Sequence, residues 1–318
     1  MRVLSAGRHP VFVQCMRDVA YTQQQCTLAQ SAICAGVGVH SGVRARIALR
    51  PAVPDSGIRF LRTDLDAPGD PIPAHATCVT DVKLGTTLSN DQGVTVAVVE
   101  HLLAACAGMG IDNLLIEIDG PEVPIMDGSA AVFCDLIRAA GVAPQAALRR
   151  RIRVLETVEV QDGAKWARLA PSDATCLSLD ARIDFETAAI GEQHMALDLT
   201  PGLFARDVAH ARTFGFARDV AYLQSIGLAR GGSLDNAVVI DGDQIMNPEG
   251  LRCEDEFVRH KLLDAIGDLM LAGAPLAGAY SAYQPGHAMN NRLVRALLAA
   301  PEAWCWEEAS EIGLRASA

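Results

Sequence analysis

Hydrophobic and polar positions along the chain predict two successive groups of strands and helices. In the first half, alternation over 24–50 indicates opening strands, and the apolar run VTVAVVEHLLAACAG predicts a helix from about Thr95 to Gly108. NLLIEIDG predicts a strand, and DGSAAVFCDLIRAAG predicts a second helix that ends before Gly141. Stretches rich in Pro, Gly and Asp indicate the loops between these elements.

The second half repeats this order of elements. RIRVLETVEV, KWARLAP, CLSLDARIDF and NAVVIDG predict strands, and a long helix is expected from about Glu254 to Ala272. A last strand and helix follow in AGAYSAYQPGHAMNNRLVRALLAA. The polar, basic joint VAPQAALRRRIRV separates the halves. The pattern therefore predicts two α/β units of similar content, over 24–147 and 148–318.

The long helix EFVRHKLLDAIGDLMLAG carries charges on a side that is otherwise apolar. Its core stripe consists of Val258, Leu262, Ile266, Leu269 and Met270. His260, Asp264 and Asp268 lie on the far side, which they share with Phe257, Gly267 and Leu271. A solvated face would carry Lys, Glu and Gln instead. The pattern indicates a buried helix on which His260, Asp264 and Asp268 form a polar site suited to a cation.

Glu100 and His101 could complete a cation site together with the charged residues of the long helix. They lie in a helix that is apolar nearly all round, where an unpaired Glu costs several kcal/mol. His260 and Asp264, one turn apart, can reach the same metal, with His101 as third ligand and Glu100 as base. Such a set with an open position is typical of catalytic zinc, with iron(II) as competitor. The alternatives are a structural Glu beside a core His and a helix-surface His–Asp pair.

SAYQPGHAMNN adds a histidine after a Pro-Gly turn. His287 follows the end of a predicted strand and could act as an acid or an electrostatic group. Asp268, one turn beyond Asp264, could orient that imidazole and keep it cationic. The alternatives are an ordinary loop histidine and an ordinary helix carboxylate.

Composition narrows the classes of function. With 27 Lys and Arg against 38 Asp and Glu, the net charge of −11 argues against nucleic-acid binding. No apolar run is long enough to span a membrane, and the N-terminus lacks the features of a signal peptide. The nine cysteines are scattered without a CxxC pair, so they are expected to be reduced. These features predict a soluble cytoplasmic protein.

Three stretches carry a family resemblance: VEHLLAACAGMGIDNLLIEIDGPEVPIMDGSAAVF, ARTFGFARDVAYLQSIGLARGGSLDNAVV and EDEFVRHKLLDAIGDL. They closely resemble the UDP-3-O-acyl-N-acetylglucosamine deacetylases, the zinc amidases of lipid A synthesis in Gram-negative bacteria, over roughly residues 24 to 305. The resemblance implies an α+β fold of two similar domains, each a small β-sheet layered against helices, with the active site at their interface. Residues 1–23 precede the usual start, as a disordered tail or the product of a mis-set start codon.

The resemblance also implies roles for individual residues. One Zn²⁺ per chain, or Fe²⁺, would be bound by His101, His260 and Asp264. Catalysis would rest on Glu100 as general base, on His287 as its protonated partner with Asp268 behind it, and on Thr213 at the oxyanion. The substrate would be contacted by Lys261, by Lys165 at the diphosphate, by Phe185 at the uracil, and by Phe214, Phe216 and Asp219 along the sugar and acyl chain. DVAYLQSIGLARGGSLDNAVV would form the acyl-chain tunnel.

The expected function is hydrolysis of the 2-acetamido group of UDP-3-O-(3-hydroxyacyl)-N-acetylglucosamine, giving the free amine and acetate in the committed step of lipid A biosynthesis. One alternative is a zinc amidohydrolase of another acylated amino sugar. The other is a non-catalytic nucleotide-sugar-binding protein, although such a protein would be expected to have lost Glu100 or His287. The expected binding partner is the small-molecule UDP-linked substrate. The protein is expected to be a monomer.

Overall fold

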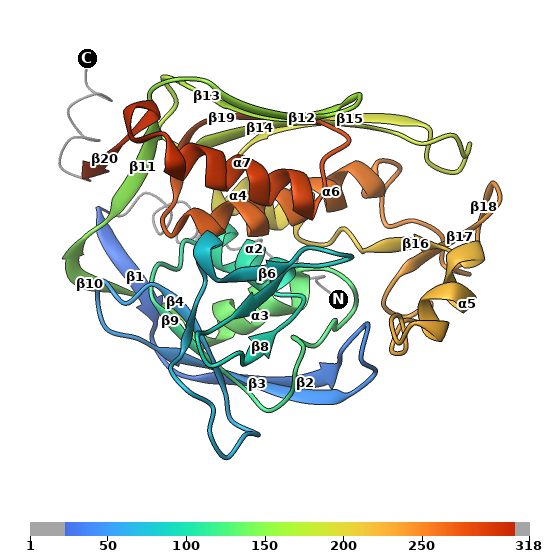
Figure 1. Cartoon of the computed structure of the whole chain (residues 1–318), viewed down its shortest axis with the longest axis horizontal. Helices are drawn as coiled ribbons and strands as arrows, with labels where there is room; N and C mark the ends of the chain where they lie inside the picture. The colour runs from blue at the N-terminus through green and yellow to red at the C-terminus, as the bar shows by residue number, and fades with distance from the viewer. Residues whose placement is uncertain (1–22, 309–318) are drawn as a thin grey trace, which may run out of the picture.

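The computed structural model describes residues 23–308, and the strands before Arg149 form three small sheets (Figure 1). These strands are β1 (Gln24–Leu28), β2 (Ala32–Val37), β3 (Arg44–Pro51), β4 (Ile58–Arg62), β5 (Ile72–Pro73), β6 (Val79–Asp81), β7 (Thr87–Ser89), β8 (Thr95–Val96), β9 (Leu114–Ile118) and β10 (Val142–Leu148). The orders are β2-β3-β9-β4-β5, β6-β7-β8 and the pair β1-β10. The predicted extension over 1–23 lies, except for its last residue, outside the described residues.

The later strands form a seven-stranded sheet and a three-stranded one. They are β11 (Arg150–Val154), β12 (Val158–Asp162), β13 (Lys165–Ala170), β14 (Leu177–Asp184), β15 (Glu192–Asp198), β16 (Phe214–Phe216), β17 (Val238–Asp241), β18 (Gln244–Ile245), β19 (Leu276–Tyr283) and β20 (Trp304–Glu308). In the larger sheet β19 pairs with β11, β13 and β14, and β15 continues from β14. Buried and exposed positions alternate along β14, because one face of this sheet is covered by helices.

The helices lie mainly between the sheets (Figure 1). They are α2 (Glu100–Gly108), α3 (Ala131–Ala140), α4 (Pro201–Leu203), α5 (Ala217–Ser225), α6 (Glu256–Leu269) and α7 (His287–Ala299). Short helical turns occur at η1 (Ala76–Cys78), η2 (Phe204–Val208), η3 (Met270–Ala272) and η4 (Pro301–Ala303). α7 packs on β12 and β13, α6 on β14 and β15, and α2 on α6 from the opposite side. α6 is therefore covered on two sides, which explains its buried charged residues.

Helices α2 and α6 approach closely enough for their backbones to touch. A Cβ placed on Gly267 of α6 would lie only 2.0 Å from the carbonyl oxygen of Glu100. Any larger residue at this position would force the helices apart. The glycine thereby places the first turn of α2 directly against the C-terminal half of α6.

The helix expected from Thr95 begins five residues later, at Glu100. Thr95 and Val96 instead pair with β7 as strand β8. Val98 has a φ of 56°, which a right-handed helix cannot accommodate. A short run of Val and Thr fits a buried strand as well as a buried helix, so hydrophobicity alone could not locate this boundary.

The prediction of an α+β fold is confirmed by these sheets and helices. Within residues 23–308 no sheet combines strands from both sides of Arg149, and the division into domains over 24–147 and 148–318 stays a prediction. No helix in this part of the chain has both the length and the hydrophobicity needed to cross a bilayer. Among the described cysteines, seven are free thiols: Cys34, Cys78, Cys106, Cys134, Cys176, Cys253 and Cys305.

We expect Gly267→Ala to lower the free energy of unfolding by about 1–3 kcal/mol, because the added methyl group meets the backbone of α2. Ala has a higher helix propensity than Gly, so a loss of stability can be attributed to the steric clash with α2. Urea denaturation followed by fluorescence measures the effect. Gly202→Ala is the matched control, since nothing lies within 4 Å of a Cβ at that position. Equal stability of the two variants would contradict the close crossing.

Candidate functional site

Helices α2 and α6 bring three side chains that can bind a metal together. His101 is the second residue of α2, while His260 and Asp264 lie one turn apart on α6. One donor atom from each lies within 4.8 Å of the other two. Nε2 of His101 is 3.5 Å, and Nε2 of His260 is 3.3 Å, from the same Oδ1 of Asp264. The three predicted ligands thus converge on one point from two helices.

The donor atoms of this trio have the free lone pairs that a metal requires. Oδ1 of Asp264, the oxygen that faces Nε2 of both imidazoles, is buried without a hydrogen-bond partner, which costs about 1–3 kcal/mol unless a cation binds there. Nδ1 of His260 lies 3.1 Å from the carbonyl oxygen of Ala211. A carbonyl only accepts, so Nδ1 carries the proton and Nε2 keeps its lone pair. Two imidazoles and one carboxylate fit a divalent metal ion.

The surroundings keep the two ligands of α6 in the protonation states that bind metals. Burial lowers the pKa of His260 to about 3, so that the imidazole is neutral. For Asp264, burial would raise the pKa, but the ammonium of Lys261 opposes this effect, and the pKa lies well below its usual range. Nζ of Lys261 donates to Oδ2 of Asp264 at 2.7 Å, leaving Oδ1 to face the two imidazoles.

A carboxylate and an imidazole face each other beside this trio. Oε2 of Glu100, the first residue of α2, accepts a hydrogen bond of 2.9 Å from the backbone N–H of Thr86. Its Oε1 lies 3.9 Å from Nε2 of His287. Nδ1 of His287 donates to Oδ2 of Asp268 at 2.9 Å, because a carboxylate oxygen is the acceptor. The imidazole is therefore oriented with Nε2 towards Glu100.

Two carboxylates control the charge of His287. Burial opposes the charged imidazole, but Asp268 and Glu100 outweigh it and raise the pKa of His287 to about 10. Burial also raises the pKa of Glu100 above its ordinary value. The site therefore pairs an imidazolium with a carboxylate that is poorly solvated. The alternative of an ordinary loop histidine was wrong, since His287 is the first residue of α7.

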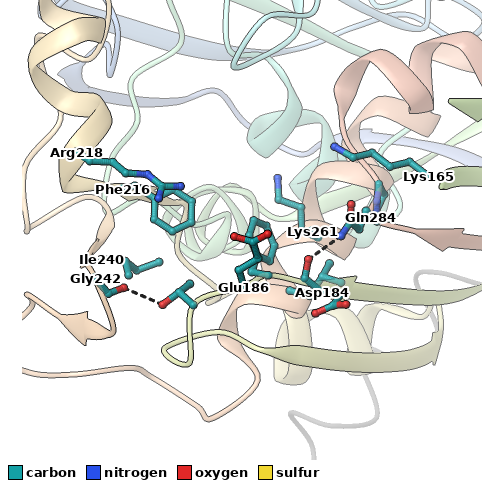
Figure 2. A pocket seen from close by; sticks show the side chains of 13 residues that line it. Lys165, Asp184, Glu186, Phe216, Arg218, Ile240, Gly242, Lys261 and Gln284 are labelled. Atoms are coloured by element: carbon teal, nitrogen blue, oxygen red, sulfur yellow. Dashed lines mark hydrogen bonds between the residues drawn. The ribbon is translucent and has the colours of Figure 1, made fainter. Parts of the chain in front are cut away.

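A cavity of about 480 Å³ opens beside Lys261 (Figure 2). Four of the predicted substrate contacts line it: Lys165, Phe185, Phe216 and Lys261. Arg218 also lines it and stacks over Phe216, with 4.8 Å between its guanidinium carbon and the ring centroid. Cationic side chains next to aromatic rings suit a ligand that combines negative charge with a flat ring.

Phe214 lies between this cavity and the metal-binding trio. Its ring centroid is 5.8 Å from that of Phe185, which lines the cavity, and 6.2 Å from that of His260. Nζ of Lys261 lies 5.4 Å from the centroid of Phe214. The cavity and the trio are thus adjacent parts of one region.

Two predicted site residues have less direct positions. Thr213 is half-buried, and its backbone N–H donates a hydrogen bond of 2.8 Å to the carbonyl oxygen of Gly128. It lies two residues after Ala211, whose carbonyl oxygen orients His260. Asp219 is exposed on the first turn of α5, with Oδ1 4.0 Å from Nε of Arg218, and does not line the cavity. The structure therefore places Asp219 at the margin of the site.

Thr86, Asn290 and Arg218 belong to this region but were not predicted from the sequence. Thr86 and Asn290 are buried and donate hydrogen bonds to Asp268 from positions 182 and 22 residues away. No local pattern connects residues at such separations. For Arg218 a signal exists, since it is a cation two residues after the aromatic residue Phe216.

Comparison with known proteins gives consistent matches over most of the chain. The family model for UDP-3-O-acyl N-acetylglycosamine deacetylase matches residues 25–299. A UDP-3-O-acyl-N-acetylglucosamine deacetylase of Myxococcus xanthus is 53% identical over 292 residues, covering 92% of this chain and 90% of the relative. Deacetylases of the same name from Phenylobacterium zucineum and Haemophilus influenzae are each 50% identical, covering 88% of this chain and 95% and 92% of the relatives.

We expect the free energy of unfolding of His287→Gln to be lower than that of the wild type below pH 6.5. The expected difference is at least ~1 kcal/mol, which is roughly the free energy that corresponds to a pKa shift of one unit. The folded-state pKa is raised from 6.5 to about 10, so the charged imidazole stabilises the fold fully below pH 6.5 and loses this effect as pH rises towards 10. Urea titrations across this range, with a chelator throughout, measure the difference. His194→Gln, at an exposed position beside Asp180, is the control. A difference in stability that grows as the pH rises would contradict a charged, stabilising His287.

Proposed function

This chain belongs to the UDP-3-O-acyl-N-acetylglucosamine deacetylase family, and we propose that it hydrolyses the 2-acetamido group of UDP-3-O-(3-hydroxyacyl)-N-acetylglucosamine. The products are the free amine and acetate, in the committed step of lipid A biosynthesis. The observation that carries the proposal is the buried trio of His101, His260 and Asp264 with Glu100 and His287 beside it. We propose that the protein is a monomer in the cytoplasm, and the free thiols of Cys34, Cys106 and Cys134 are in keeping with that reducing compartment.

We propose zinc as the metal, one ion per chain. Imidazole nitrogens and a carboxylate oxygen are common zinc ligands, and iron(II) competes for the same donor set. The buried, unpaired Oδ1 of Asp264 supports a cation at this point. When bound, zinc supplies Lewis acidity, which polarises a carbonyl group and acidifies water.

Glu100 is the general base of the proposed reaction. Its carboxylate removes a proton from the water that attacks the acetamide carbonyl carbon. The hydrogen bond from Thr86 N–H fixes Oε2, and Oε1 remains directed towards His287. Because burial raises the pKa of Glu100, this carboxylate is a better proton acceptor near neutral pH than an exposed one.

His287 completes the proton transfers as the general acid. It carries a proton on each nitrogen at neutral pH, one bonded to Asp268 and one on Nε2. As the C–N bond breaks, Nε2 gives its proton to the departing amine, and the former carbonyl carbon leaves as acetate. Thr213 is proposed to donate a hydrogen bond to the oxyanion that forms between these steps.

The cavity beside Lys261 is the proposed position of the nucleotide. Lys165 would bind the diphosphate, Lys261 would contact the nucleotide-sugar and Phe185 would stack on uracil. Phe214, Phe216 and Asp219 would border the sugar and acyl chain. The segment around α5 would cover the acyl chain, which is supported by the exposed hydrophobic side chains of Tyr222 and Ile226.

Acetate release from UDP-3-O-(3-hydroxyacyl)-N-acetylglucosamine tests the proposal. We expect activity to disappear on chelation and to return with about one equivalent of zinc per chain. A folded, zinc-loaded sample that releases no acetate would contradict it. Turnover of another acylated amino sugar would then indicate a related amidohydrolase, and UDP-sugar binding without turnover would indicate a non-catalytic protein.

We expect Glu100→Gln to lower kcat by about 10²- to 10⁴-fold, the usual contribution of a general base. The metal content should not change, since Glu100 is not one of the three ligands and the amide oxygen can still accept from Thr86. Initial rates and elemental analysis measure both quantities. Glu117→Gln, on β9 and paired with Arg50, is the matched control. A wild-type kcat would remove Glu100 from the mechanism.

A further inference from the structure

We propose that Thr86 is a positioning residue that holds the base and the acid of this site in register; the inference rests on the proposed function. Thr86 precedes β7 and is completely buried, with 0% of its surface exposed. Its backbone N–H donates to Oε2 of Glu100 at 2.9 Å, and its hydroxyl donates to Oδ1 of Asp268 at 2.7 Å. One residue thereby bonds to both carboxylates that flank His287.

The two bonds join parts of the chain that are far apart in sequence. Glu100 lies 14 residues after Thr86, at the start of α2, whereas Asp268 lies 182 residues after it, in the last turn of α6. The backbone can approach Glu100 because Gly85 precedes Thr86. Gly85 has a φ of 156°, and a Cβ there would lie 3.1 Å from Oε1 of Glu100.

The hydroxyl of Thr86 completes the hydrogen bonding of Asp268. Oδ2 of Asp268 accepts from Nδ1 of His287 and from Nδ2 of Asn290, both at 2.9 Å. Asn290 is held in turn by the hydroxyl of Tyr280, which donates to Oδ1 of Asn290 at 2.8 Å. Thr86 is the partner of the remaining oxygen, Oδ1. With both oxygens bonded, the carboxylate of Asp268 cannot rotate without breaking a buried hydrogen bond.

This arrangement determines where the imidazole of His287 points. Asp268 fixes Nδ1, and the ring then presents Nε2 to Glu100 at 3.9 Å. Without the hydroxyl of Thr86, Oδ1 of Asp268 would be a buried acceptor without this partner, and the carboxylate would turn to find another. Because neither bond of Thr86 reaches the nucleotide cavity, the effect should fall on turnover and not on substrate binding.

Thr86→Val tests this role, since it removes the hydroxyl, keeps the shape and leaves the backbone N–H for Glu100. We expect kcat to fall about 10- to 100-fold, as when the supporting partner of a catalytic group is removed, with KM and metal content nearly unchanged. Thr86→Ser keeps the hydroxyl and should retain most of the kcat. Thr87→Val, at the neighbouring position, is the matched control and should behave as the wild type.

The proton NMR signal of the His287 Nδ1–H provides a readout that a purely structural role would not move. The signal is assigned by its absence in His287→Gln. We expect it to shift or broaden in Thr86→Val and to stay unchanged in Thr86→Ser and Thr87→Val. If Thr86→Val does not fold, Thr86→Ala replaces it, because Ala and Ser also differ by the hydroxyl alone.

A wild-type kcat and signal in Thr86→Val would overturn the inference, and so would a Thr86→Ser variant as impaired as Thr86→Val. Failure of the proposed function gives a different result, namely a wild type that releases no acetate. In that case the NMR comparison still decides whether Thr86 holds Asp268 and His287.

Discussion

The contact between α2 and α6 is the constraint on which the site depends. One helix contributes Glu100 and His101 and the other contributes His260, Asp264 and Asp268, so none of the chemistry exists until the two helices meet. The contact is possible because Gly267 allows its own backbone to touch the carbonyl of Glu100. A rigid helix crossing of this kind holds reactive groups more accurately than loops do. The sheets outside the helices serve to hold this crossing in place.

The crossing also concentrates charge in a place that water does not reach. Glu100, Asp264 and Asp268 are each at most 2% exposed, and isolated carboxylates would not remain ionised there. The nearby cations are His287 between Glu100 and Asp268, and Lys261 on Asp264. A metal at the trio would add further positive charge. The cations that stabilise the buried carboxylates thus also create an acid, a base and a metal site.

The sequence allowed good predictions wherever a local pattern carried the information. The pairing of His260 with Asp264 follows from helix periodicity, and the burial of α6 on two sides follows from the apolar residues around its charges. The start of α2 could not be predicted, because the left-handed backbone of Val98, between β8 and α2, cannot be recognised from hydrophobicity. Thr86 was missed because its partner Asp268 is distant in sequence and becomes a neighbour only in the fold.

X-ray absorption at the zinc edge can show whether helices α2 and α6 together form the metal site. With one equivalent of zinc per chain, we expect a shell of nitrogen and oxygen ligands only, at ~2.0–2.2 Å, with the scattering signature of two imidazoles. His101→Ala, on α2 alone, should lose one imidazole from that shell. A sulfur ligand at ~2.3 Å, or a spectrum unchanged by His101→Ala, would show that the metal is not bound by both helices in this way.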